Sequence, residues 1–278
     1  SVGLFGVAAS EDLYGVNVAG LAVGCGETMT GINVAGLAVG CGEDLAGINV
    51  AGLAVGSGGT IKGLNAALLA VGSGNDAFGI NIAGLAAGAG ENLSGLNFAG
   101  LAVGAGESMS GLNFGGLATG AGEDISGISL SLLAVGCGED MRGLSIGGLA
   151  AGSGESIKGV TVAGLAVGCG DEMTGISVAI LAVGAPGVKG IQAALVVGGE
   201  SVRGATLAPA YFRIEGDDGR MVGLSVSAFN HIRGSQHGVA IGIFNYTYDI
   251  KGLQLGLLNH VRDNPKGLRW LPIFNTRF

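Results

Sequence analysis

Glycine recurs every sixteen residues along most of this chain, and that period is the feature that most constrains the fold. It occupies positions 15, 31, 47, 63, 79, 95, 111, 127, 143, 159 and 175. One unit, residues 31–46, reads GINVAGLAVGCGEDLA. Neighbouring units keep an aliphatic residue after the first Gly, then Asn, Ser or Thr, and later a Leu. A strict period of this length indicates a tandem-repeat protein in which each unit packs on its neighbours.

The repeat does not suit a helix, because each unit holds several Gly residues and each costs roughly 1 kcal/mol in a helix interior. Short runs of apolar and small residues alternate instead, as they do in strands. Short strands joined by Gly corners at a fixed period predict an all-β, parallel β-solenoid with coils of about 16 residues. Like residues of successive coils would then stack about 4.8 Å apart.

The alternation also suggests which side chains face inward. Because the pattern slips by one residue near Gly36, we expect a bend there that points both apolar sets, Ile32 with Val34 and Leu37 with Val39, into one interior. The Asn column could form an internal hydrogen-bonded ladder or an exposed row. In the phase favoured here Asn33 faces outward with the small residues, giving a flat Ala/Asn/Gly wall.

An antiparallel β-barrel is the alternative. Trp270, Phe274 and Phe278 fall on one face of a final strand, as in outer-membrane proteins. The two apolar phases within each unit do not give a continuous lipid-facing stripe, so we favour the solenoid.

Composition excludes several function classes. The 278 residues carry 13 Lys or Arg and 21 Asp or Glu, a formal net charge of −8, and 48 % are hydrophobic. The chain is too apolar to be disordered and too acidic for nucleic acid to be its main partner. No run of 18 apolar residues predicts a transmembrane helix. Four Cys share a repeat column that elsewhere holds Ser or Ala, and we interpret them as small packing residues: Cys25, Cys41, Cys137 and Cys169.

Acidic residues form another column, next to the Gly-x-Gly corner. Stacked carboxylates repel one another, so these side chains should splay into solvent. We interpret the column as a solubilising stripe or as a linear polyanionic interaction surface. Its candidate residues are Glu27, Glu43, Glu91, Glu107, Glu123, Glu139 and Glu155.

The repeat loosens after Gly184, which predicts two regions. Residues 1–184 form a regular solenoid body, and residues 185–278 an irregular continuation that serves as a C-terminal cap or docking section. Residues 1–174 carry 3 basic and 15 acidic groups, whereas residues 175–278 carry 10 basic and 6 acidic groups. Because Arg and aromatic residues are typical of interfaces, the candidate docking residues are Arg213, Arg233, Arg262, Arg269, Trp270 and Phe274.

The phrases GLQLGLLN (residues 252–259) and GLRWLPIFN (residues 267–275) resemble a family of bacterial surface-repeat proteins with tandem glycine-rich units. The Gly-aliphatic-Asn units extend the resemblance over most of the chain. It implies a secreted or cell-envelope location, in the periplasm, at the outer-membrane surface or outside the cell, and little chemistry.

No nucleophile elbow, Cys-x-x-Cys pair or His-Glu-x-x-His motif occurs in the sequence. We therefore predict no enzymatic activity, no catalytic residue, no metal and no cofactor. We expect a structural or docking solenoid whose partner is a protein or another copy of itself. The alternatives are a binding module that uses the flat wall for a polymer or ice, and an accessory subunit attached to a larger membrane assembly through its C-terminal section.

Overall fold

The protein is a parallel β-solenoid. Its structure, a computed structural model, describes residues 1–277, which contain no helix and thus none long and apolar enough to cross a membrane. Successive coils pair in parallel at the sixteen-residue spacing, for example Ile32 with Ile48 and Asn33 with Asn49. The predicted fold class is confirmed, and the antiparallel alternative, which relied partly on Phe278 outside the described residues, is wrong.

The chain divides into two compact units, Ser1–Gly147 and Gly148–Phe278. The strands of the first are β1 (Val2–Gly3), β2 (Gly6–Ala9), β3 (Leu13–Ala19), β4 (Ala22–Cys25), β5 (Met29–Ala35), β6 (Ala38–Cys41), β7 (Leu45–Ala51), β8 (Ala54–Ser57), β9 (Ile61–Ala67), β10 (Ala70–Ser73), β11 (Ala77–Ala83), β12 (Ala86–Ala89), β13 (Leu93–Ala99), β14 (Ala102–Ala105), β15 (Met109–Gly115), β16 (Ala118–Ala121), β17 (Ile125–Ser131), β18 (Ala134–Cys137) and β19 (Met141–Gly147). Those of the second are β20 (Ala150–Ser153), β21 (Ile157–Ala163), β22 (Ala166–Cys169), β23 (Glu172–Ala179), β24 (Ala182–Gly184), β25 (Gly187–Ala193), β26 (Val196–Gly199), β27 (Ser201–Ile214), β28 (Arg220–Val261) and β29 (Trp270–Asn275). This division does not test the predicted boundary after residue 184, which stays a prediction.

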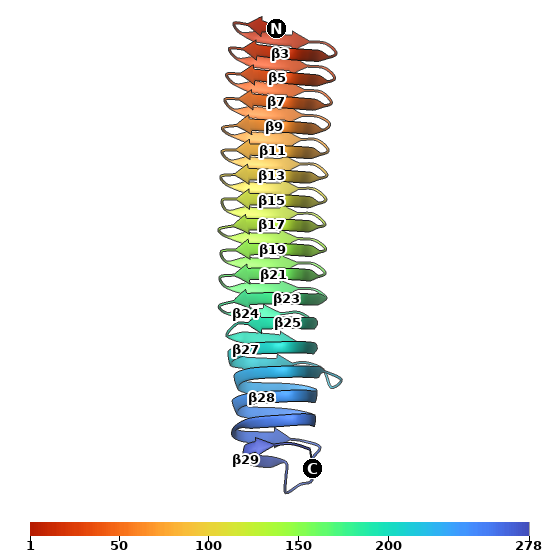
Figure 1. The fold of residues 1–278 in the computed structure, drawn as a ribbon, viewed down its shortest axis with the longest axis vertical. Helices are drawn as coiled ribbons and strands as arrows, with labels where there is room; N and C mark the ends of the chain where they lie inside the picture. The colour runs from red at the N-terminus through yellow and green to blue at the C-terminus, as the bar shows by residue number, and fades with distance from the viewer. Residues whose placement is uncertain (278) are drawn as a thin grey trace. The chain divides into compact units, whose positions relative to one another are not determined.

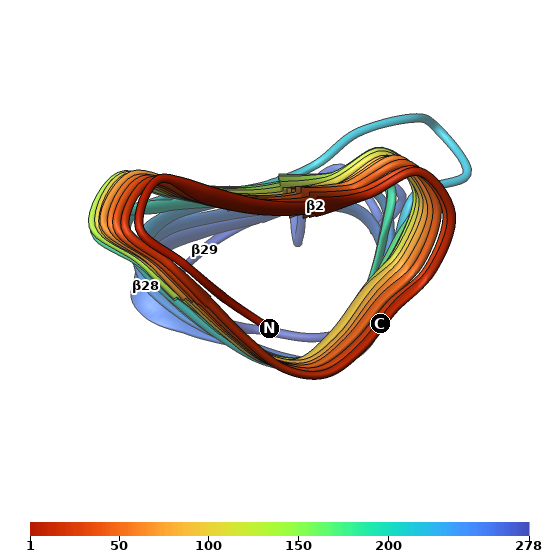
Figure 2. The same cartoon turned by 90° about the horizontal axis from the view of Figure 1, so that it is seen from above.

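Each coil of the first unit contains one long and one short strand joined by tight bends. Long strands pair with long strands and short with short, so that β5 lies between β3 and β7, and β6 between β4 and β8 (Figure 1). Seen end-on, these coils superpose around a common interior (Figure 2). Every side chain therefore belongs to a row of equivalent side chains that runs from coil to coil.

Glycine is required at the corners of the coil. Gly31 has a φ of +135°, and a Cβ there would lie 1.9 Å from the carbonyl oxygen of Gly15. A Cβ on Gly36 would lie 2.1 Å from the carbonyl oxygen of Gly20. Since real Cβ atoms do not come this close to a carbonyl oxygen, the spacing of the glycines fixes the length of the coil.

The predicted inward phase is right for Val39 in the short strand and wrong for the long strand and for Leu37 at the bend. Val39 is 1 % exposed, as expected, but Ile32 is 42 % and Leu37 44 % exposed, while Asn33 and Ala35 are buried. The interior is narrow: it takes one column of bulky side chains, such as Met29 and Leu45, and fills its other columns with Ala, Val and Asn. The longer aliphatic side chains of the long strand are therefore left outside.

A ladder of amides occupies the interior of the first unit. Asn33 Nδ2 donates to Asn49 Oδ1 at 2.8 Å, Asn49 donates in the same way to Asn65, and the chain of bonds runs from Asn17 to Asn113. Each amide from Asn33 to Asn97 both gives and receives a hydrogen bond, which offsets the cost of burying it. The Asn column thus belongs to the core: of the two alternatives that the sequence left open, the internal ladder is confirmed and the outward row is wrong.

The last coils of the second unit have a different build. Strand β28 runs unbroken through 42 residues, so its coils lack the tight bends of the first unit (Figure 1). Asn230 Nδ2 donates to Asn245 Oδ1 and Asn245 Nδ2 to Asn259 Oδ1, both at 2.7 Å. Strand β29 then pairs antiparallel with the end of β28, from Gln254 opposite Asn275 to His260 opposite Trp270. This pairing covers the edge of the last coil.

Candidate interaction surfaces

Three rows of apolar side chains cover the outside of the long strands in the first unit. Row one follows the corner Gly, as Ile32 does, and row two lies two residues further on, as Val34 does. Row three is the Leu at the following bend, such as Leu37. Residues two apart in a strand share a face, so rows one and two point the same way. We call the three rows together the apolar outer face.

The apolar outer face is broadly exposed and carries no charge in the first unit. Row three is 42–46 % exposed throughout. From residue 16 to residue 147, the residues of the face that are at least 36 % exposed, including two from the bend, are Val16, Ile32, Ile48, Leu96, Ile128, Val18, Ile82, Phe98, Phe114, Ile146, Leu21, Leu37, Leu53, Leu69, Leu85, Leu101, Leu117, Leu133, Leu68 and Leu132. Monomeric soluble proteins rarely expose a continuous patch of this kind, so it is a candidate interaction surface.

Leu68 and Leu132 stand out from the bend between rows two and three. Most other coils have Gly at this position, as at Gly36 and Gly84, although the first coil has Leu4. The two Leu side chains are 70 % and 67 % exposed and lie 64 residues, or four coils, apart. A large apolar side chain that packs so little on its own chain is available to another surface.

A shallow hollow lies beside Leu68. Row two has Ala66 in that coil instead of a Val, Ile, Leu or Phe, and the hollow is lined by Val50, Ala51, Ala66, Ala67, Leu68 and Ile82. Because Leu68 remains mostly exposed, its own side chain does not fill the space. One coil therefore carries both a protrusion and a depression.

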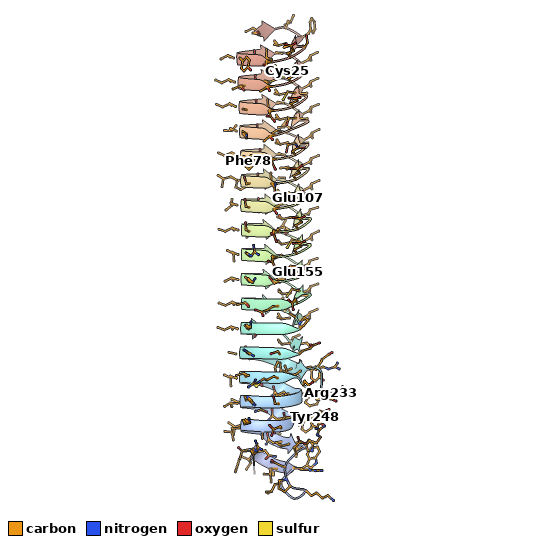
Figure 3. The ribbon with its side chains drawn as sticks, turned by 90° about the vertical axis from the view of Figure 1, so that its right-hand side faces the viewer. Cys25, Phe78, Glu107, Glu155, Arg233 and Tyr248 are labelled. Atoms are coloured by element: carbon orange, nitrogen blue, oxygen red, sulfur yellow. The ribbon has the colours of Figure 1, made fainter. Side chains whose placement is uncertain are left out.

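The predicted acidic column is exposed at the turn that follows each short strand. Every Glu that we singled out there is exposed, and Glu107 projects away from its coil (Figure 3). The backbone N–H of Glu107 donates to the carbonyl oxygen of Glu91 at 2.9 Å, so the turns stack while their carboxylates spread. The column lies outside the apolar outer face, and its use as an interaction surface stays a prediction.

Some of the predicted docking residues are brought together in the last coils. The Arg262 guanidinium lies 3.5 Å from the ring centre of Tyr248 and pairs with Asp263. Trp270, 52 % exposed, contacts the rings of Phe244 and His260. These residues form one cluster on the C-terminal coils.

The other docking residues are held elsewhere. Arg213 pairs with Glu215 at 3.2 Å, and Arg269 Nε donates to the carbonyl oxygen of Asn264. Arg233 and Phe274 are exposed, and Figure 3 shows Arg233 projecting outward. The role of all six residues in docking stays a prediction.

A set of stacked rings was missed in the sequence. Tyr211, Phe229 and Phe244 follow one another in successive coils at centroid distances of 5.3 and 4.9 Å. His231 lies beside them and accepts or donates a 2.8 Å hydrogen bond with the Tyr211 hydroxyl. The signal was present, because an aromatic residue precedes each of the segments FRI, NHI and NYT, but the changed coil length hid the column.

Burial lowers the pKa of His231, and the nearby Arg233 and Arg213 lower it further. Burial, followed by Arg269, likewise lowers the pKa of His260. Both rings are therefore neutral at pH 7, which suits their places in an aromatic stack.

The four Cys are free thiols. Cys25 and Cys41 lie in register in neighbouring coils. Burial raises the pKa of Cys41 to about 12 and that of Cys137 to about 11. Such thiols stay protonated at neutral pH and are therefore poor nucleophiles, as expected for residues that serve in packing.

No family model matches this chain, and no curated protein or solved structure is detectably similar to it. The resemblance to bacterial surface-repeat proteins, and the envelope location that it implies, stay predictions.

Proposed function

We propose that this protein is a non-enzymatic structural solenoid of the bacterial envelope or extracellular space that docks onto a partner through its apolar outer face. The observation that carries the proposal is the continuity of that face: three uncharged rows, broadly exposed, pass over successive coils of the first unit. Burying apolar area is the main driving force of protein association.

The interior supports a structural role. Its Asn side chains are fully buried and bonded to one another, from Asn17 through Asn113. These polar groups serve the stacking of coils and are closed to a substrate. The repeated interior side chains thus stabilise the stacked coils, and the coils hold the outer rows in place.

A labelling experiment tests the docking role. The full chain, with its native Cys replaced by Ser, is produced in an envelope-bearing bacterium with Ile82→Cys in row two, or with Ser94→Cys outside the face as the matched control. Intact cells or envelopes are then treated with a maleimide before and after detergent denaturation. Docking predicts that the thiol introduced at position 82 is protected until denaturation, while the thiol at position 94 reacts at once. Equal reactivity of the two sites in the native sample would contradict it.

A second candidate is attachment to a larger assembly through the C-terminal section. It is favoured by the exposed Trp270 and Phe274 on β29, which are 52 % and 50 % exposed. The double variant Trp270→Ser with Phe274→Ser tests it: the chain should move from the particulate to the soluble fraction. Unchanged fractionation of a folded variant would refute this candidate.

A further inference from the structure

The apolar outer face has properties that suit one partner above others, a second copy of this chain. We propose that two copies pack face to face through this surface, side by side and with their coils in register. The inference rests on the proposed docking role and names the partner. Four observations carry it: area, period, relief and charge.

The area is sufficient for a stable dimer. About twenty exposed or half-exposed apolar residues lie on the face in the first unit. If each contributes on the order of 60 Å² of apolar area, the face offers roughly 1,200 Å². A standard interface buries about 800 Å² on each partner, so the rows of one unit exceed what a specific dimer needs.

The period of the face is matched by another copy. Its side chains recur every coil, at about 4.8 Å. Over many coils, only a surface with the same repeat keeps its side chains in the same phase. A second copy has that repeat by construction, and β faces of this kind pack about 10 Å apart.

The relief of the face suggests how the copies fit. Row two bears side chains, whereas the Gly column at the bend, represented by Gly36 and Gly84, bears none, so we infer a ridge along row two and a furrow between rows two and three. A twofold axis parallel to the stacking direction would place the ridge of each copy in the furrow of the other. Such an interface is isologous and closes as a dimer.

The Gly furrow is filled by a Leu in three coils of the first unit, at Leu4, Leu68 and Leu132, and in the coil of Leu68 the filling is self-complementary. There the furrow is filled by Leu68, and the ridge is reduced to Ala66 beside an open hollow. With the two copies in register, Leu68 of one copy lies against Ala66 of the other, and the reverse. In this coil the large residue and the small one thus occur where the proposed symmetry pairs them, whereas Leu132 would face the larger Leu130.

Charge does not oppose this packing. The three rows contain no Asp, Glu, Lys or Arg in the first unit, so no unpaired charge is buried there. The exposed Glu column belongs to the turn after the short strands, represented by Glu107 (Figure 3). The copies therefore associate while their carboxylates remain in solvent.

Light scattering and sedimentation equilibrium of the purified full chain test the proposal. We expect a dimer at micromolar concentration. The double variant Ile82→Asp with Leu101→Asp should raise the dissociation constant at least a hundredfold, whereas Ser94→Asp, which adds a charge outside the face, should not change it. Leu68→Gly, which introduces the residue that most other coils have there, should raise it about tenfold. Circular dichroism of each variant verifies that it is folded.

The arrangement is tested by cross-linking. The native Cys are again replaced by Ser, the residue that other coils have in that column. Chains with Ala66→Cys are then mixed with chains with Leu68→Cys under oxidation. A disulfide between the two chains is expected only for parallel copies in register. Its absence from a folded dimer would overturn this arrangement.

Two results would overturn the second copy as partner: a wild-type chain that stays monomeric up to 100 µM, or a dimer that the Asp double variant leaves intact. Vesicles of zwitterionic phosphatidylcholine provide a further measurement. A monomer that binds them, and loses binding in the Asp double variant, would replace the second copy with a lipid surface. If the thiol at position 82 is protected in cells while the pure chain is monomeric, the docking role survives and the dimer does not.

Discussion

The coils of the first unit and the last coils of the second both bury amides that bond from coil to coil, but they place them at different positions on the coil. In the first unit the buried amide ladder lies in the long strand, at Asn33 and Asn49, and the short strand buries Val39. In the last coils the ladder is formed by Asn230 and Asn245, which follow Phe229 and Phe244. Both regions thus stack buried amides from coil to coil, but the two ladders occupy different positions on the coil.

The side chains on the outside of the short strand also differ between the two regions. The short strand of the first unit shows only Ala and Gly on its outside, as at Ala70 and Gly72, whereas the register of β26 and β27 places Tyr211 opposite Val196 and Arg213 opposite Gly198. His231 then lies opposite Arg213. Large side chains are thus compatible with this column, and the coil itself does not demand Gly there.

The largest effect should come from a corner Gly. Gly79 has a φ of +111°, and a Cβ there would lie 2.2 Å from the carbonyl oxygen of Gly63. We expect Gly79→Ala to lower the free energy of unfolding by about 3 kcal/mol or more. At Gly72 a Cβ would lie 3.7 Å from its nearest neighbour, the carbonyl oxygen of Gly88. Gly72→Ala should raise the free energy by about 0.5 kcal/mol. Urea denaturation compares the two, and equal losses would show that the short-strand Gly is structural after all.

The amide ladder gives the next effect. Asn65→Ala removes two buried hydrogen bonds and leaves Asn49 Nδ2 and Asn81 Oδ1 unpaired. We expect a loss of about 3 kcal/mol in the free energy of unfolding. Asn113 ends the ladder, and its own Nδ2 lacks a partner among the described residues. Asn113→Ser should cost about 1 kcal/mol. Denaturant melts distinguish the two, and similar losses would refute a ladder that is stabilised link by link.

The ring stack of the second unit predicts sensitivity to acid. Because the pKa of His231 is lowered in the folded state, the unfolded chain binds its proton first as the pH falls. Stability from this group is complete above the ordinary His pKa of 6.5 and is lost as the pH drops through the lower folded value. We expect the melting temperature to fall between pH 7 and pH 5, and less so in His231→Phe. A variant with unchanged acid sensitivity would exclude His231 as the cause.

The smallest effect concerns the Cys column of the first unit. The pKa of Cys41 is about 12 when folded, against 9.0 for an ordinary thiol. Its contribution to stability is therefore complete below pH 9 and is lost as the pH rises toward 12. At about pH 8, just below the ordinary thiol pKa, we expect iodoacetamide to modify Cys41 much more slowly in the native protein than in urea, as followed by mass spectrometry. Equal rates would mean that the thiol is not protected by its coil.

The sequence by itself determined the coil. Its sixteen-residue Gly period specifies where the chain turns, because the corner at Gly31 admits no Cβ. That period predicted parallel stacking, like on like, and the acidic residues of the turns were correctly placed outside. The predicted docking residues Arg262 and Trp270 also lie in the last coils, where each contacts a ring.

Only the tertiary structure decided which face of each strand is inside. Hydrophobicity alone places Ile32 in the core and Asn33 in solvent, and the structure reverses them. A narrow interior has room for few large side chains, and stacking lets the amides satisfy one another at a distance of sixteen residues. That reversal moves the aliphatic rows outside, and with them the surface through which we propose that the protein meets its partner.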